Sequence, residues 1–223
     1  SELGSLTGIG DIRALALFGN HAYLADFTGS LRIVNIFDPT APVQVGSLAL
    51  TSPQGVFIHY PYAYMADGAS GLRIVDISDP ATPTLTGTLD TAGDARKVQV
   101  EGSYAYLADY RSYAGTPSGW LRVIDVSVPA APVEVSATDT SYSALDVFIS
   151  GQRAFVLGDS LGGMDIFDVS APAAPIALGS YPGRFSGGID VLGNYAYLVS
   201  PLSGGASGDG VLHVVDLSDM ARP

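Results

Sequence analysis

The stretch LRIVN at residues 31–35 decides the fold, because close copies of it recur along the whole chain. The copies are LRIVD at 72–76, LRVID at 121–125, MDIFD at 164–168 and LHVVD at 212–216. Their first residues, at positions 31, 72, 121, 164 and 212, lie 41 to 49 residues apart. Such a period is typical of an array of similar supersecondary units, so residues 1–223 are interpreted as one domain of five repeats.

Two further elements recur at fixed distances from this anchor. Upstream lies YLAD at 23–26, with counterparts at 64–67, 106–109, 155–158 and 197–200. Downstream, a proline stands eight positions after the first anchor residue in four units, and Met220 takes its place in the fifth. A second proline, eleven positions after it, occurs in all five units: Pro42, Pro83, Pro132, Pro175 and Pro223. Proline has no N–H for a central ladder, so these residues mark the connection to an outer strand.

Each unit therefore predicts four short strands. The strand positions hold mostly Val, Ile, Leu, Tyr and Phe, and no stretch keeps a capped helical period. Four strands per unit indicate an all-β, five-bladed β-propeller of four-stranded antiparallel blades, each burying both faces against its neighbours. A content of 47% hydrophobic residues agrees with such burial. A β-helix or a sandwich is the alternative, with a poorer fit to the number of strands per repeat.

The two ends of the chain continue one another in the repeat register. SELGSL at 1–6 aligns with VQVGSL at 43–48, the predicted strand that follows Pro42, and the same strand is next due directly after Pro223, which corresponds to Pro42. We predict that the N-terminal segment supplies the outer strand of the last blade and closes the ring, leaving no open sheet edge. The alternative is that the five units are cut from a longer array.

The LRIVD anchor, the AYLAD strand and the DPxxP turn together resemble the LVIVD-repeat family of bacterial and archaeal proteins. The resemblance extends over essentially all 223 residues. It departs in the fourth unit, with MDIFD and Gly158, and in the fifth, with Ser200 and Met220. It implies an extracellular or cell-surface β-propeller and no particular activity. On this basis we expect a secreted or cell-surface protein.

The charge balance excludes some partners. The chain has 22 acidic and 10 basic residues, a net charge of -12, and Lys97 is its one lysine. Such a charge repels nucleic acid and anionic lipid, and no apolar segment is long enough to enter a membrane. The chain has no cysteine, which excludes thiolate chemistry, and no phosphate-binding or zinc-protease motif. We predict no cofactor.

A metal site is likewise not predicted. His21, His59 and His213 stand at different repeat positions. The aspartates that end the second strands, Asp26, Asp67 and Asp109, have the oxygen ligands that calcium prefers, but each belongs to a different blade. Turn capping by a short acceptor side chain is the favoured interpretation for them.

Acidic residues in or just before the predicted innermost strands are compatible with an enzyme, because glycan hydrolysis uses paired carboxylates. The candidates are Asp11, Asp94, Asp146 and Asp190. The first two each precede an arginine by two positions, Arg13 and Arg96, so local ion pairs are expected. Asp146 aligns with Lys97 and is expected to pair with it, whereas the repeat explains nothing about Asp190. A glycan-active hydrolase or lyase that uses channel carboxylates is therefore the alternative function.

Two insertions interrupt the repeat between the second and third strands, at 110–120 and 201–211. Both loops should open on one propeller face together with Asp11, Arg13, Asp94 and Arg96, and insertions in repeat proteins gather on the binding face. The first insertion carries rings and a guanidinium suited to a protein or glycan ligand: Tyr110, Arg111, Tyr113 and Trp120. We therefore predict a non-catalytic binding or assembly module, or alternatively a structural subunit of a surface filament or larger complex.

Overall fold

In the part of the chain that the structure describes, all regular secondary structure is β-strand. This computed structural model describes residues 2–113, 116–158, 162–183, 185, 188–200 and 210–219, with side chains 112–117 left out. No helix in those ranges is long and apolar enough to cross a lipid bilayer. The all-β class predicted from the repeats is confirmed.

The strands form five antiparallel sheets, one for each repeat. The first blade contains β1 (Ile12–Phe18), β2 (His21–Asp26), β3 (Ser30–Asn35) and β4 (Val43–Ala49). The second contains β5 (Gly55–His59), β6 (Tyr62–Ala66), β7 (Leu72–Asp76) and β8 (Thr84–Leu89). The third contains β9 (Asp94–Glu101), β10 (Tyr104–Tyr113), β11 (Thr116–Asp125) and β12 (Val133–Thr140). The fourth contains β13 (Asp146–Ser150), β14 (Arg153–Leu157), β15 (Gly163–Asp168) and β16 (Ile176–Pro182), and the fifth β17 (Gly188–Leu192), β18 (Tyr195–Ser200) and β19 (Val211–Asp216).

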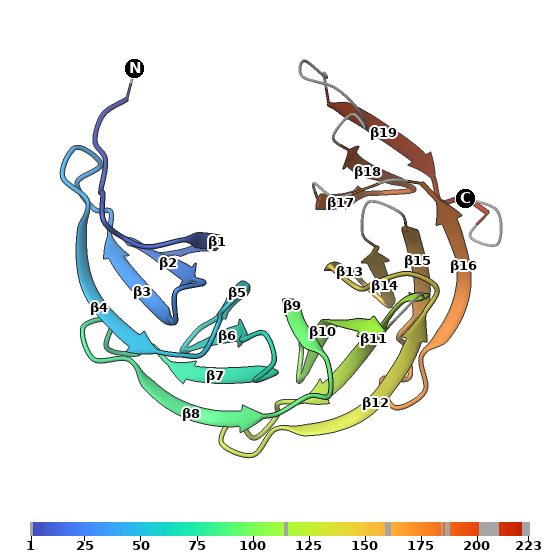
Figure 1. Ribbon diagram of the computed structural model, residues 1–223, viewed down its shortest axis with the longest axis horizontal. Coiled ribbons are helices and arrows are strands. Elements are labelled where there is room, and N and C mark those ends of the chain that lie inside the picture. The colour runs from blue at the N-terminus through green and yellow to red at the C-terminus, as the bar shows by residue number, and fades with distance from the viewer. Residues whose placement is uncertain are drawn as a thin grey trace.

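The sheets stand side by side in an arc, as in a β-propeller (Figure 1). The first strands of the five repeats line the inside of the arc, and β4, β8, β12 and β16 form its outer rim. Within each complete sheet the spatial order follows the chain order, as repeated antiparallel hairpins require.

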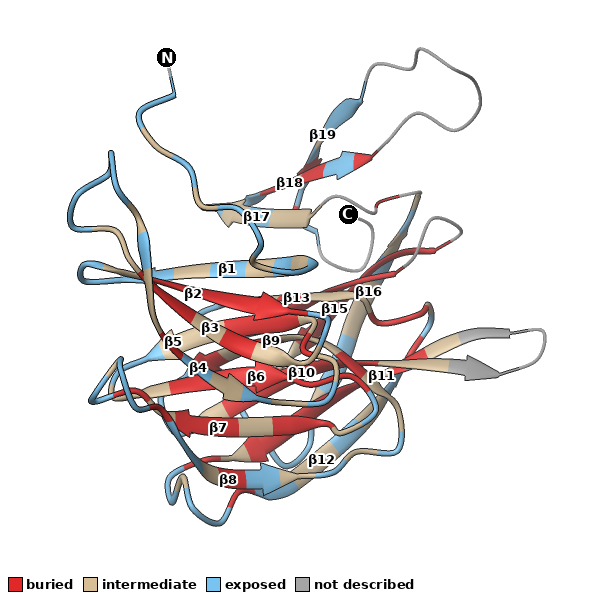
Figure 2. Ribbon diagram, turned by 60° about the vertical axis from the view of Figure 1, so that its left-hand side comes forward, coloured by how far each residue is buried: buried red, intermediate tan, exposed pale blue. Residues whose placement is uncertain are grey.

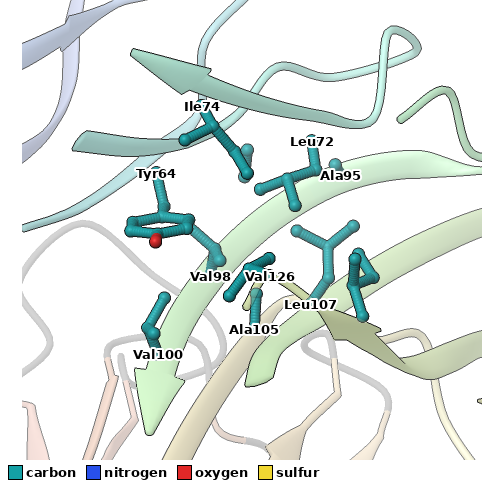
Figure 3. Close-up of a cluster of buried hydrophobic side chains, with 11 residues drawn as sticks. Tyr64, Leu72, Ile74, Ala95, Val98, Val100, Ala105, Leu107 and Val126 are labelled. Carbon is teal, nitrogen blue, oxygen red and sulfur yellow. The ribbon is translucent and has the colours of Figure 1, made fainter. Parts of the chain in front are cut away.

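The core lies between the blades. Between the second and third blades, Tyr64, Leu72 and Ile74 pack against Val98 and Leu107 (Figure 3). The anchor positions Leu and Ile are fully buried in this cluster, and β2, β3, β6 and β7 are buried on both faces over most of their length (Figure 2). Because both faces are covered, these strands show continuous apolar runs and not alternation.

The outer strand of one blade rests on the proline turn of the next. Gly46 and Gly87 occupy one repeat position, and a Cβ at either would collide with a backbone carbonyl, that of Pro80 or Pro129. In the third blade Ser136 stands there, and its hydroxyl donates a hydrogen bond of 2.8 Å to the Pro172 carbonyl. The close backbone approach explains the glycines of this strand.

Replacing Gly87 by Ala should therefore lower the free energy of unfolding by about 1–3 kcal/mol, because the added methyl group overpacks a contact with backbone. Urea denaturation followed by circular dichroism measures the change. Thr88→Ala, at an exposed position of the same strand, serves as the control and should change it by less than about 0.5 kcal/mol. Equal effects of the two substitutions would contradict the packing argument.

The predicted ring closure is not seen in this structure. The fifth sheet has three strands, and residues 2–11 belong to no strand. They lie instead along the first blade, where a Cβ at Gly4 would come 2.6 Å from the Pro39 and Thr40 carbonyl oxygens. Leu6 and Ile9 pack near Leu24 of that blade.

The insertion at 110–120, predicted to be a loop, is instead an extended hairpin. β10 and β11 pair continuously, with Tyr110 opposite Gly119 and Arg111 opposite Ser118, and together they project from the third blade (Figure 2). The prediction of a loop was wrong because the added residues keep their N–H and C=O groups in the ladder. Of the second insertion, residues 201–209 lie outside the described part of the chain.

Candidate functional site

The molecule has two ends, which differ in their connections. At one end, called the turn end, the turn between the first and second strands of each blade lies beside the proline turn. In the first blade the carbonyl of Asn20 accepts a 2.9 Å hydrogen bond from the N–H of Ile36. Equivalent bonds occur in the other four blades. The opposite end, called the insertion end, holds the connections between the second and third strands of each blade, among them the β10–β11 hairpin. The innermost strands also begin at this end. As predicted, Asp11, Arg13, Asp94 and Arg96 share the end that carries the first insertion.

Two similar arginine sites stand at the insertion end, in the first and third blades. Arg13 donates a 2.7 Å hydrogen bond to the Asp11 carboxylate, and its guanidinium carbon lies 4.8 Å from the centre of the Phe27 ring. Arg96 donates to Asp94 at 2.7 Å and lies 5.0 Å from the Tyr110 ring centre. Both predicted local ion pairs are confirmed. Asp11 and Arg13 are about half exposed, and Phe27 is 38% exposed. Asp94, Arg96 and Tyr110 are less exposed than Phe27.

Phe27 was missed in the sequence although its position was informative. It follows the aspartate of β2 as Tyr110 follows the aspartate of β10, and only the first and third repeats have both this ring and the Asp-x-Arg pair. The co-occurrence of ring and arginine within a repeat was the available signal. The structure shows its cause, since the guanidinium lies over the ring and gains a cation–π interaction.

Trp120 lies between two arginines at the base of the hairpin. Arg111 lies 4.9 Å from the Trp120 ring centre and Arg122 lies 4.7 Å from it. The ring is half-buried and covers the nearly buried Arg122, so it both packs the hairpin on the blade and remains partly accessible. The side chain of Tyr113 lies outside the described residues.

The aspartates that end the second strands are buried caps, as the sequence indicated. Asp26 accepts the backbone N–H groups of Asp11 and Thr28, each at 3.0 Å, and Asp67 accepts those of Thr51 and Ser52. Burial opposes ionisation of Asp26, but hydrogen bonds from Thr28 and Arg32 outweigh it and hold the pKa of that carboxyl well below its usual range. Asp26 is therefore a structural anion.

An arginine of the anchor strand completes each of these sites and was not predicted. Arg32 donates to Asp26 at 2.7 Å, Arg73 lies 3.9 Å from Asp67, and Arg122 contacts Asp109. The signal was again present in the repeats, because the units that lose the aspartate also lose the arginine.

The last two blades show how the pair is replaced. In the fourth, Gly158 replaces the aspartate and Asp165 stands at the arginine position, where it accepts the N–H of Ser141 at 2.7 Å. Burial raises the pKa of Asp165 against the lowering effect of that bond. In the fifth blade the hydroxyl of Ser200 and Nε2 of His213 are 3.0 Å apart, and this hydrogen-bonded pair stands in place of the ion pair.

The inner-wall carboxylates form no acid cluster among the described residues. Asp190 is exposed and accepts the N–H of Val191 at 2.8 Å. Burial raises the pKa of Asp146, and the charge of Lys97 in the neighbouring blade lowers it. In the described part of the chain no three His, Asp or Glu side chains are grouped to hold a metal ion.

Comparison with known families agrees with this architecture. A model of the LVIVD repeat matches residues 9–49, 53–91, 92–140, 143–182 and 183–223. The chain belongs to the LVIVD repeat family. The matched units coincide with the five blades, so the family resemblance of the motifs is confirmed over nearly the whole chain.

Solved structures with low sequence identity share the fold of this LVIVD-repeat chain. A protein from Lactobacillus plantarum matches with a TM-score of 0.73 and 17% identity over 96% of this chain and 72% of its own. A functionally unknown protein from Desulfotomaculum acetoxidans matches with a TM-score of 0.69 and 16% identity, over 88% and 65%. A chain from a nidogen/laminin complex matches with a TM-score of 0.62 and 11% identity, over 85% and 72%. No curated protein matches the sequence.

Proposed function

We propose that this LVIVD-repeat chain is a non-catalytic binding module of the cell surface whose insertion end holds a protein partner. The observation that carries the proposal is the presence at that end of partly exposed rings with guanidinium groups over them, at Phe27, Tyr110 and Trp120. Arginine and large aromatic residues dominate the energetics of protein interfaces. Nothing in the repeat pattern calls for them, since the second blade folds with Gly68 at the position of Phe27 and Tyr110.

The rigidity of the site favours recognition. The strands that hold Tyr110 and Trp120 are paired on both sides at their bases, so these side chains are presented by a ladder and not by a loop. Arg13 in the first blade and Arg96 in the third each form an ion pair of 2.7 Å with an aspartate. A preorganised surface loses little conformational entropy on binding.

Two alternative functions are a glycan-active enzyme and a structural subunit of a larger complex. A glycan-active enzyme would use Asp146 and Asp190 on the inner wall, and Asp190→Asn should then abolish turnover of a polysaccharide. A structural subunit of a filament or larger complex would use the blade edges. The chain in the nidogen/laminin complex shows that this fold also occurs in a protein assembly. The surface location is supported by the family resemblance.

The hairpin offers a direct test of the proposed site. Replacing residues 112–117 by Asn-Gly joins the opposed pair Arg111 and Ser118 through a two-residue turn and should preserve the blade. We expect this variant and Tyr110→Ala to weaken binding of the partner at least about tenfold, because a central aromatic contact is lost. The measurement uses immobilised protein and the surface proteins of the source organism, followed by titration of the purified partner.

Hydrogen exchange of the reconstituted complex locates the contact. The expected result is protection of β10 and β11 near Tyr110 and Trp120. Leu85→Ala, an exposed change on an outer strand, is the control and should leave binding unaltered. Undiminished binding by both hairpin variants would overturn the site, and retention of polysaccharide in its place would indicate a glycan ligand.

We also propose that the arc closes into a five-bladed ring, with the N-terminal segment as the fourth strand beside β19. Gly4 already occupies the place against Pro39 that Gly46 occupies against Pro80, and Leu6 matches Leu48 in the repeat. The open faces of the first and fifth blades carry the positions that form every other blade interface. Leu212 and Val214, exposed here, correspond to the buried Leu72 and Ile74. Closure would bury both faces and remove the free edge of β19.

A further inference from the structure

At the turn end, the first blade departs from the repeat at three positions that surround one cavity. His21 stands where three other repeats have Tyr62, Tyr104 and Tyr195 and one has Arg153. Asn35 replaces the aspartate that ends the anchor in the other four repeats, and Phe37 replaces a serine that all four share. A position that serves the fold is expected to follow the repeat, so three departures around one cavity require another explanation.

The cavity has a volume of about 450 Å³. Its walls come from the β1–β2 turn, the end of β3, the proline turn and the start of β4, including Asn20, His21, Asn35, Phe37 and Asp38. This volume falls in the range of small-ligand sites, which combine an aromatic or apolar wall with a few polar groups. It lies at the end of the molecule opposite to the hairpin.

Phe37 supplies an exposed aromatic surface at this cavity. The side chain is 75% exposed, so its ring contributes little to the core. The serines at this position in the other blades have a structural task, since Ser78 donates both its N–H and its hydroxyl to Asp76. In the first blade the backbone bond remains, from the N–H of Phe37 to Asn35 Oδ1 at 2.8 Å, and the hydroxyl is exchanged for a ring.

Two polar groups of the cavity, Asn35 and Asp38, are held by hydrogen bonds from neighbouring residues. The Oδ1 of Asn35 is held by Phe37, and Asp38 is held by the N–H and hydroxyl of Thr40 at 2.9 and 2.6 Å. Asn35 has an NH₂ group with two donors where the other blades have a carboxylate, and Asn20 and His21 add further donors and acceptors. The exchange of Asp for Asn removes a negative charge from this wall.

We propose that this cavity binds a neutral saccharide, with one pyranose ring stacked on Phe37 and its hydroxyl groups bonded by Asn20, His21, Asn35 and Asp38. The C–H face of a pyranose matches an exposed aromatic ring, and amides, imidazole and a carboxylate match hydroxyls that both donate and accept. The charge-reducing change from Asp to Asn fits an uncharged ligand better than a cationic one. This site is separate from the insertion end and does not depend on the protein partner proposed there.

The repeat itself provides variants that test the site without disturbing the fold. Phe37→Ser and Asn35→Asp install the residue that the other four blades carry, and His21→Tyr installs the residue of three of them, so the folded structure should be kept. The probes are methyl glucopyranoside, methyl galactopyranoside, methyl mannopyranoside and N-acetylglucosamine, with glucuronate and choline as charged comparisons. Binding is measured by saturation-transfer NMR and by titration of backbone amide shifts.

We expect at least one neutral probe to bind the wild-type protein with shifts confined to 20–21 and 35–45. Phe37→Ser should weaken this binding about tenfold, and Asn35→Asp should weaken it as well, with unchanged circular dichroism. Tyr110→Ala, at the other end, should leave it unaltered, which separates this proposal from that of the protein partner. Absence of binding by all four neutral probes, tighter binding of glucuronate or choline, or full binding by Phe37→Ser would overturn it.

Discussion

Replacing Arg122 by Leu should lower the free energy of unfolding by about 3–5 kcal/mol, because it leaves Asp109 as a buried carboxylate without its countercharge. The Asp109 side chain is fully buried, and that of Arg122 is 7% exposed. Arg122 also donates to Glu134 at 2.6 Å and lies under Trp120. Three interactions are therefore lost with one side chain. Urea denaturation followed by Trp120 fluorescence and by circular dichroism gives the measurement.

A surface pair provides the matched control. Arg13 and Asp11 are 2.7 Å apart, as are Arg32 and Asp26, but the side chains of Arg13 and Asp11 are about half exposed. Arg13→Leu should therefore lower the free energy of unfolding by less than about 1 kcal/mol. The double replacement of Asp109 and Arg122 by Leu should cost less than Arg122→Leu alone, because no charge then remains buried. A loss of less than 1 kcal/mol for Arg122→Leu would contradict the buried-pair interpretation.

Truncating Leu72 to Ala should lower the free energy of unfolding by about 2–5 kcal/mol, because its fully buried side chain lies between two blades and leaves a cavity. Leu212 is the same repeat position in the fifth blade and is 62% exposed here. If the ring closes as proposed, Leu212→Ala should cost an amount similar to Leu72→Ala. The pair of unfolding curves decides between a closed and an open arc.

An open arc predicts a different effect of Leu212→Ala. In an arc that stays open, Leu212→Ala should change stability by less than about 0.5 kcal/mol. Sedimentation velocity excludes the other explanation, in which a second copy covers the face, because that would make the cost of Leu212→Ala depend on protein concentration. A small, concentration-independent effect would contradict ring closure.

The strands could be predicted from the sequence because each rests on a pattern that repeats. The LRIVD anchor predicted the third strand of every blade, and the paired prolines predicted the fourth strand of the first four blades. The extension of β10 and β11 could not be predicted, since an insertion such as YRSYAGTPSGW has turn residues at its centre and no counterpart in the other repeats. Whether its arms pair depends on the ladder already formed at their bases.

The candidate sites were harder to predict for a related reason. Asp11, Arg13, Asp94 and Arg96 could be assigned as ion pairs because both partners are close in sequence. The pairs of Asp109 with Arg122 and of Arg13 with Phe27 join residues 13 and 14 positions apart across strands, and only the comparison of repeats could have shown them. The comparison of repeats could also have shown Phe37, because the other four units have a serine at that position.

The buried Asp67 determines where one repeat can be exchanged for another. Its carboxylate accepts N–H groups of Thr51 and Ser52, which precede the first strand of the blade, and Arg73 on the next strand lies 3.9 Å from it. A crossover inside this stretch would separate an acceptor from its donors, whereas one at the proline turn would leave the set intact. Duplication and shuffling of these genes should therefore have breakpoints near the prolines, and chimaeras joined there should fold where those joined inside a blade should not.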